Sequence, residues 1–164
     1  MLTCRKHDTF YAKSLTLTGL NGTSAENFVD YWFNVAFNLD RIWWFQLDLH
    51  GGAHAGVWEH DNGVTSYAHR DKLYIIQFYD RVIGEPYPAN GFQFLDGWLD
   101  ATTEPLKWGE WGMYVNYVDA RLGRREAEEL YWGKNVPRLR RIKAQVDPGE
   151  LFFNPISIEP ARGR

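Results

Sequence analysis

Polar side chains at alternate positions of an apolar segment are the features of this chain best suited to chemistry. Residues 42–49 place Trp44, Gln46 and Asp48 at even positions, whereas every odd position is apolar. A second apolar segment adds Gln77. Because successive side chains of a strand face opposite sides, these polar groups are expected on one face of a sheet. A few placed polar groups on an apolar surface are typical of a ligand pocket. The alternative is that they satisfy neighbouring backbone or loop groups.

A third segment, residues 111–118, adds phenols to this set through Tyr114 and Tyr117, with Asn116 between them. A phenol has a reference pKa of about 10, so it needs help from a group such as the Asp48 carboxylate to serve as a base near neutral pH. Period-two alternation places Tyr114 and Asn116 on one face and Tyr117 on the other. Either a bulge near Asn116 turns Tyr117 toward the same ligand, or the two tyrosines have different roles.

The elements that must position these groups alternate along the chain. Hydrophobic spacing predicts strands at residues 10–18, 42–49, 73–80 and 111–118, and helices at residues 23–39, 92–101, 123–133 and 136–146. Thr23 and Glu26 form the pattern of a capping box. This order predicts an α+β fold, an antiparallel sheet with helices covering one face and a C-terminal helical arm. A composition shift near residue 105 divides the chain into residues 1–105 and 106–164.

The last predicted helix, residues 136–146, is basic and amphipathic. Leu139, Ile142 and Val146 are expected on its buried side. The basic residues around it are Lys134, Arg138, Arg140, Arg141 and Lys143. They are most simply read as a solvated face, with an acidic partner surface or a cofactor phosphate as alternatives.

Composition narrows the possible functions. The 164 residues suit one domain, and the net charge of −3 gives no electrostatic footprint for nucleic acid or an anionic membrane. Cys4 is the single cysteine, and His50, His54 and His60 have no spacing typical of a metal site, so no metal is expected. The 8 Trp, 9 Tyr and 10 Phe indicate either a core of large rings or a groove for a flat or sugar-like ligand.

Several sequence blocks occur together in a characteristic order. They are Tyr11-Ala-Lys-Ser-Leu, Trp44-Phe-Gln-Leu-Asp-Leu-His-Gly-Gly, Tyr67-Ala-His-Arg-Asp-Lys-Leu-Tyr-Ile-Ile-Gln-Phe-Tyr, Gly91-Phe-Gln-Phe-Leu-Asp-Gly-Trp, Trp111-Gly-Met-Tyr-Val-Asn-Tyr-Val-Asp, Tyr131-Trp-Gly-Lys-Asn and Asp147-Pro-Gly-Glu-Leu-Phe-Phe-Asn. This order resembles the C-terminal part of the berberine-bridge-enzyme-like FAD-linked oxidases, in particular the fungal glucooligosaccharide-oxidase type. The resemblance implies that residues 1–105 are a portion of the substrate-binding domain and that residues 106–164 pack on a flavin domain.

The resemblance also implies a reaction. A tyrosine helped by an aspartate removes the proton of a sugar's anomeric hydroxyl, hydride passes to FAD, and oxygen reoxidises the flavin. Tyr117 matches the base and Asp48 its partner. The remaining matched positions are Gln46, Gln77 and Trp44 as substrate contacts, and Tyr114 and Asn116 as residues beside the flavin ring.

The flavin-binding half of the family has no counterpart in this sequence. Its phosphate-binding loop and the His and Cys that attach FAD covalently are not matched, and Cys4 lies in the wrong place for that role. We therefore expect the chain by itself to hold FAD weakly or not at all, and to require a separate FAD-binding domain besides its oligosaccharide substrate. A flavin-free sugar- or small-molecule-binding relic and a non-redox cyclase are the alternative functions. The family implies secretion, although the N-terminal residues form no apolar signal segment.

Overall fold

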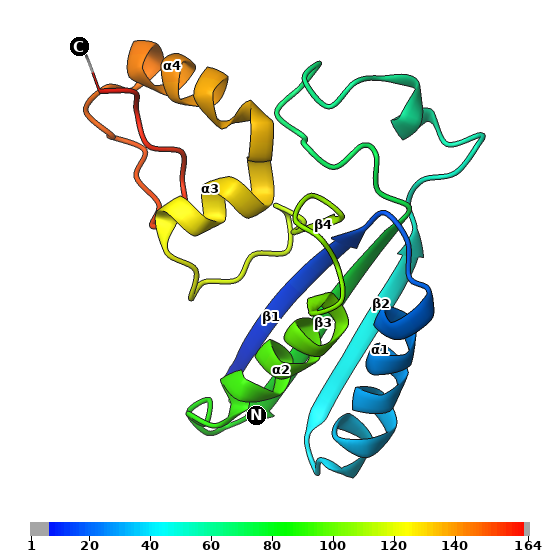
Figure 1. Ribbon diagram of the computed structural model, residues 1–164. Helices are drawn as coiled ribbons and strands as arrows, with labels where there is room; N and C mark the ends of the chain where they lie inside the picture. Colours follow the sequence, from blue (N-terminus) through cyan, green and yellow to red (C-terminus); the bar gives the residue numbers. More distant parts are fainter. Residues whose placement is uncertain (1–6, 163–164) are drawn as a thin grey trace, which may run out of the picture.

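The computed structural model describes residues 7–162, so Cys4 lies outside the described part. Its centre is an antiparallel sheet with strand order β2-β3-β1-β4 (Figure 1). The strands are β1 (Asp8–Leu17), β2 (Ile42–Leu49), β3 (Tyr74–Ile83) and the short β4 (Trp111–Gly112). The predicted α+β class is confirmed, and β2 has the predicted bounds.

Two helices, α1 (Gly22–Asn34) and α2 (Gly91–Thr103), cover one face of the sheet (Figure 1). Between them lies the fully buried Trp98, whose ring centroid is 5.3 Å from that of Phe28, 5.4 Å from that of Phe45 and 5.3 Å from that of Phe78. Aromatic rings bury large apolar areas and prefer tilted or edge-on packing. Much of the high aromatic content therefore builds this core.

A C-terminal arm lies beside the β4 end of the sheet (Figure 1). It consists of α3 (Arg124–Trp132), the 3₁₀ turn η3 (Gly133–Asn135) and α4 (Val136–Val146). Two further 3₁₀ turns are η1 (Ala36–Asn38) and η2 (Gly56–Glu59). Within residues 7–162, no helix has the length and apolar character needed to cross a membrane.

The predicted strand over residues 111–118 is wrong beyond Gly112. The chain leaves the sheet there, and the Tyr117 N–H donates to the Tyr114 carbonyl oxygen at 2.9 Å. This bond closes a tight turn over residues 114–117, with Val115 and Asn116 at its centre. We call it the tyrosine turn. The alternation of side chains in this segment therefore does not reflect the two faces of a strand, and a bulge near Asn116 does not apply. That the two tyrosines have different roles stays a prediction.

The predicted capping box at the start of α1 is also wrong. The Ala25 N–H donates to the Asn21 carbonyl oxygen at 3.4 Å, so the helix begins before Thr23. Asn21 occupies the N-cap position without a side-chain capping bond, and Gly22 follows it with a φ of 50°. A left-handed φ favours glycine, which explains why the helix begins at this turn.

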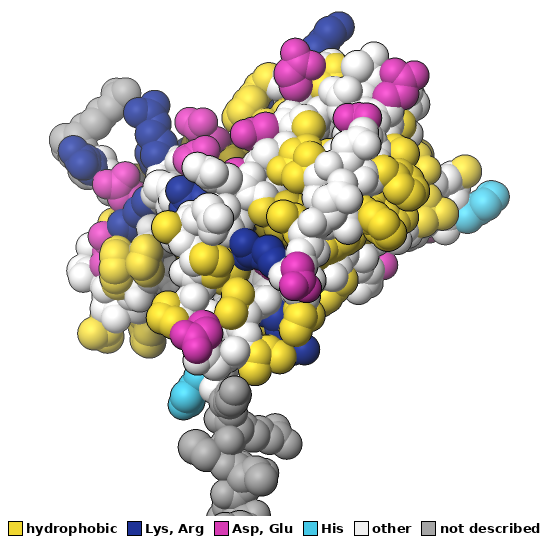
Figure 2. Space-filling view, turned by 90° about the horizontal axis from the view of Figure 1, so that it is seen from below, with side chains coloured by type: hydrophobic (Ala, Val, Ile, Leu, Met, Phe, Trp, Pro, Cys, Tyr) yellow, Lys and Arg dark blue, Asp and Glu magenta, His cyan; other side chains and the backbone are white. Residues whose placement is uncertain are grey.

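Two of the three residues predicted on the buried side of α4 are exposed instead, since Ile142 and Val146 keep 42% and 74% of their surface accessible, whereas Leu139 is half-buried. The basic residues nevertheless have partners within the chain: Arg140 pairs with the buried Glu128, and Lys143 pairs with Asp147. Figure 2 shows how broadly hydrophobic side chains reach the surface on one face of the molecule. The apolar side of α4 is thus only partly covered by residues 7–162.

Candidate functional site

The face of the sheet opposite α1 and α2 carries the predicted polar groups. Directly opposed residues of antiparallel strands place their side chains on the same face. Three rows cross β2, β3 and β1 on this face: Trp44–Tyr79–Ala12, Gln46–Gln77–Ser14 and Asp48–Ile75–Thr16. The register thus brings together the ring, the amides and the carboxylate that the strand pattern placed on one side.

This face is covered over β1 and open over β2. Ser14 and Thr16 are fully buried, whereas Trp44 keeps 42% of its surface accessible and Gln46 is exposed. The Trp44 ring stacks on that of Tyr79, with centroids 5.4 Å apart. The result is a half-open surface with an aromatic platform at one end and polar groups beside it.

Asp48 gathers both predicted glutamines. The Gln46 amide donates to its two carboxylate oxygens at 2.9 and 3.1 Å, and the Gln77 amide donates to one of them at 3.2 Å. A carboxylate accepts several hydrogen bonds, so both amide groups are fixed with their carbonyl oxygens turned away from Asp48. Sequence reasoning placed these three side chains on one face, and the structure adds the bonds that orient them.

Tyr117 reaches the same face from the turn that follows β4. Its ring centroid lies 6.4 Å from that of Trp44. Its hydroxyl is buried and has no hydrogen-bond partner among residues 7–162, so no bond joins it to Asp48. Burial, followed by the nearby Tyr79 phenol, raises the pKa of Tyr117 to about 12. Asn116 lies in the same turn and donates to the Tyr114 hydroxyl at 3.0 Å.

A buried ionic cluster holds the chain just beyond this turn. Lys13 of β1 contacts Asp119 at 3.1 Å and Asp96 of α2 at 2.7 Å. The Tyr11 hydroxyl donates to the same two carboxylates, and the Asp119 N–H donates to the Tyr131 hydroxyl of α3 at 2.8 Å. Burial and the two carboxylates raise the pKa of Tyr11. The cluster ties the turn to the sheet, α2 and the C-terminal arm at once.

Sequence reasoning missed that His50 belongs beside this face. The sequence pattern considers His50 only as a candidate metal ligand, yet its Nε2 lies 2.9 Å from the Tyr67 hydroxyl. The available signal was parity, because His50 continues the even-numbered series of Trp44, Gln46 and Asp48. Burial, followed by the charge of Arg70, lowers the pKa of His50 despite the opposing effect of Asp48. The His50 imidazole is therefore neutral near pH 7, and it lies just beyond Asp48 at the end of β2.

The half-buried His50 and the buried His69 make folding sensitive to mild acid. Burial lowers the pKa values of both His50 and His69, whereas histidines of the unfolded chain titrate near pH 6.5. The unfolded chain therefore binds more protons as the pH falls through this range, and stability present above about pH 6.5 is lost toward the lower folded-state pKa values. We therefore expect the urea concentration at the unfolding midpoint to decrease when the pH is lowered from about 7.5 to about 5.5.

The variant His69→Gln provides a control for this pH effect. The His69 Nε2 lies 2.7 Å from the Leu130 carbonyl oxygen, and the glutamine amide has a donor that can serve the same acceptor. Because one of the two titrating groups is removed, the decline in the urea midpoint should become shallower. An unchanged midpoint across this pH range in the parent chain would contradict the expectation.

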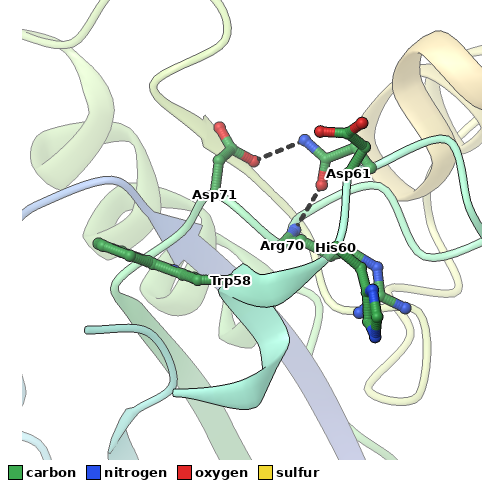
Figure 3. Close-up of a pocket in the computed structure, with 6 residues that line it drawn as sticks. Trp58, His60, Asp61, Arg70 and Asp71 are labelled. Carbon is green, nitrogen blue, oxygen red and sulfur yellow. Dashed lines mark hydrogen bonds between the residues drawn. The ribbon is translucent and has the colours of Figure 1, made fainter. Parts of the chain in front are cut away.

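A separate hollow of about 320 Å³ lies in the loop between β2 and β3, and the residues that line it are Trp58, His60, Asp61, Asn62, Arg70 and Asp71 (Figure 3). Asn62 organises it, because its amide donates to Asp71 at 3.0 Å and its carbonyl oxygen accepts the Arg70 N–H at 2.6 Å. Across residues 7–162, no three His, Cys, Asp or Glu side chains come together as a metal site would require.

Both a family profile and curated proteins of known name match the sequence of this chain. A family profile described as "Berberine and berberine like" matches residues 113–159, which include the tyrosine turn and the C-terminal arm. The carbohydrate oxidase of Microdochium nivale is 46% identical over 157 residues, and this match covers 94% of the present chain and 32% of that protein. The chain is homologous to known carbohydrate oxidases, and its residues 113–159 are similar to the berberine and berberine-like family.

Further berberine-bridge-enzyme-like relatives extend this relationship. The glucooligosaccharide oxidase of Sarocladium strictum is 41% identical over 160 residues, covering 94% of this chain and 32% of that protein. The crystal structure of the Microdochium nivale carbohydrate oxidase with a substrate analogue superposes with a TM-score of 0.91 over 94% of this chain and 33% of that one. The chain thus spans about a third of the length of the curated relatives it matches.

Proposed function

We propose that this chain supplies the substrate-binding face of an FAD-dependent oxidase that oxidises a CH–OH group of an oligosaccharide, with oxygen as the acceptor. The observation that carries the proposal is the buried hydroxyl of Tyr117 beside the polar face, which has no hydrogen-bond partner among residues 7–162. A buried polar group without a partner is costly, and beside Asp48, Gln46 and Gln77 it suggests that a bound ligand completes the bonding of this hydroxyl. The relatives with an established activity are named as carbohydrate and glucooligosaccharide oxidases.

The open half of the face has the composition of a sugar site. The half-exposed Trp44 ring, stacked on Tyr79, offers an apolar platform for the C–H surface of a sugar ring. Gln46 and Gln77 are held by Asp48 with their carbonyl oxygens free to accept bonds from sugar hydroxyls. In this proposal the ring supplies contact area and the two amides orient the substrate.

Tyr117 is the proposed base for the substrate hydroxyl. At a pKa of about 12 its phenol is protonated near neutral pH, so it must pass its own proton to an acceptor as it takes the substrate's. Asp48 is the carboxylate on the same face and is the proposed partner for this step. Because no bond joins these two side chains among residues 7–162, the substrate or a water would have to bridge them.

The tyrosine turn is also the proposed neighbour of a flat cofactor. FAD, when bound, would accept the hydride that leaves the oxidised carbon. Tyr114 and Asn116, whose side chains are bonded to each other on the turn that carries Tyr117, are the proposed residues beside its ring. We propose that residues 106–164 pack against the FAD-binding part and that residues 1–105 contribute the sugar-binding strands. The exposed Ile142 and Val146 of α4 would then be covered.

The decisive experiment is a chimera in which residues 7–162 replace the matching segment of the Microdochium nivale carbohydrate oxidase. We call this protein the flavin-holding chimera. Cello-, xylo- and chito-oligosaccharides would be supplied, and oxygen uptake and peroxide release would be measured. Consumption of oxygen and formation of the sugar lactone are the expected results.

Flavin absorbance separates a folding failure from a wrong assignment. A chimera that binds flavin in equal molar amount, yet takes up no oxygen with any of these sugars while the parent oxidase does, would contradict the proposed function. In that case calorimetry with the same sugars would report whether the face binds carbohydrate without oxidising it.

A further inference from the structure

Ser14 lies beneath the tyrosine turn, in the middle of β1. It is fully buried and occupies the row that contains Gln46 and Gln77. Its hydroxyl accepts the Tyr114 N–H at 2.9 Å and donates to the Tyr117 carbonyl oxygen at 2.9 Å, with the Tyr114 carbonyl oxygen at 3.2 Å. A single side chain thus bonds the backbone at both ends of the turn.

The bonding pattern requires a group that donates and accepts at once. A hydroxyl provides one donor and two acceptor positions, whereas the side chain of alanine or valine provides neither. Without it, the Tyr114 N–H would be left without its acceptor in a part-buried place, at a cost comparable to a lost hydrogen bond. Ser14 is also 100 residues from Tyr114 along the chain, so the contact fixes the turn against the sheet.

Tyr117 depends on this backbone anchor more than most side chains do. Its hydroxyl has no hydrogen-bond partner among the residues described, so no bond from the phenol sets the direction of the ring. The ring is instead placed by the turn and by contact with Trp44 at 6.4 Å between centroids. Small displacements of a reacting group can cost about 10²-fold in rate, so the anchor matters for chemistry as well as for folding.

We propose that Ser14 is a positioning residue, whose hydroxyl aims the Tyr117 phenol at the polar face by bonding both ends of the turn. The structural part of this proposal stands alone. Its consequence for turnover rests on the proposed function of Tyr117 as a base.

The chain offers a matched control on the same strand. Thr16 lies two residues further along β1 on the same face, and it is also fully buried. Its hydroxyl has no hydrogen-bond partner within the described part of the chain. The variants Ser14→Ala and Thr16→Val therefore each remove one buried hydroxyl, but only the first removes bonds to the turn.

The test uses the complete 164-residue chain with tyrosine labelled by ¹³C at Cζ, so that each phenol can be titrated by NMR. Burial raises the pKa of Tyr117 to about 12 in the parent chain, and Thr16→Val should keep that value. Ser14→Ala should let the pKa fall toward about 10, since a released phenol is solvated. The nuclear Overhauser contact between Trp44 and Tyr117 should weaken in the same variant only.

Three results would overturn the inference. The first is a folded Ser14→Ala protein with an unchanged Tyr117 titration and an intact Trp44 contact. The second needs no variant: free exchange of the Tyr114 and Tyr117 amide protons in the parent chain would show that the anchor is not formed, whereas protection is expected. The third is an unchanged kcat for Ser14→Ala in a flavin-holding chimera that oxidises sugars, where a fall of about 10-fold to about 100-fold is expected with little change in KM.

These measurements separate the two proposals. If the chimera fails to oxidise any sugar, the titration, the nuclear Overhauser contact and the amide protection still decide whether Ser14 holds Tyr117. If the chimera oxidises sugars but Ser14→Ala changes none of these quantities, the oxidase assignment stands and the positioning role fails.

Discussion

Replacing Tyr117 by phenylalanine is expected to lower kcat of the flavin-holding chimera by about 10²-fold to about 10⁴-fold, the usual contribution of a positioned acid–base group. The substitution removes one oxygen atom that has no hydrogen-bond partner among residues 7–162, so the fold should be little affected. KM should change little, because the proposed sugar contacts are made by Trp44, Gln46 and Gln77. Steady-state oxygen uptake with the best oligosaccharide provides the measurement.

Tyr74→Phe is the matched control for this prediction. Tyr74 is the first residue of β3, and its register places it opposite Leu17 and Leu49 on the face that packs against the helices. Losing its hydroxyl should leave kcat within about two-fold of the parent value, as expected for a group remote from the reaction. A Tyr117→Phe chimera that binds flavin and keeps the parent kcat would rule out Tyr117 as the base.

The sheet and its polar face could be predicted because their signals are local. Strand β2 follows the alternation of apolar and polar residues, so its bounds and the common face of Trp44, Gln46 and Asp48 were read correctly. Helix α4 likewise has the predicted bounds, since Pro137 lies in its first turn and Asp147 and Pro148 follow its end. The chemical roles of the residues on the polar face stay predictions.

The errors concern features that distant residues decide. The segment after Gly112 alternates like a strand, but the Ser14 hydroxyl takes the backbone bonds that a sheet partner would have made. His50 has its partner Tyr67 beyond a loop of irregular structure. The apolar side of α4 has a correct helical pattern, yet a pattern shows only that a face is apolar and cannot show what covers it.

The largest expected loss of stability follows from Asp80→Asn, with the free energy of unfolding falling by about 3–5 kcal/mol. Asp80 is fully buried on the helix-covered face of β3 and accepts hydrogen bonds from Arg41, with Nε at 3.1 Å, and from the Tyr87 hydroxyl. Burial and this carboxylate raise the pKa of Tyr87. Asparagine keeps the shape but leaves the Arg41 charge unpaired in a site where its side chain is only 15% exposed.

The packing around Arg41 leaves little room for it to escape to water. A Cβ atom at Gly91, the first residue of α2, would lie 2.5 Å from Arg41 Nη2, and the guanidinium lies 5.3 Å from the centre of the Tyr87 ring. The side chains of Arg41, Asp80 and Tyr87 therefore hold β3, the start of β2 and the start of α2 together. Since a domain is stable by only about 5–15 kcal/mol, this one charge supports a large share of the fold that carries the polar face.

The neighbouring ion pair on the same strand gives the comparison for this prediction. Arg81 contacts Asp8 at 3.1 Å with both side chains more than a third exposed, and such pairs contribute about 0–1 kcal/mol. Urea unfolding of Asp80→Asn and Asp8→Asn would therefore distinguish burial from simple loss of a charge. Equal losses in the two variants would mean that water reaches Arg41, and the connection between β3 and α2 would then have to depend on the aromatic core around Trp98 alone.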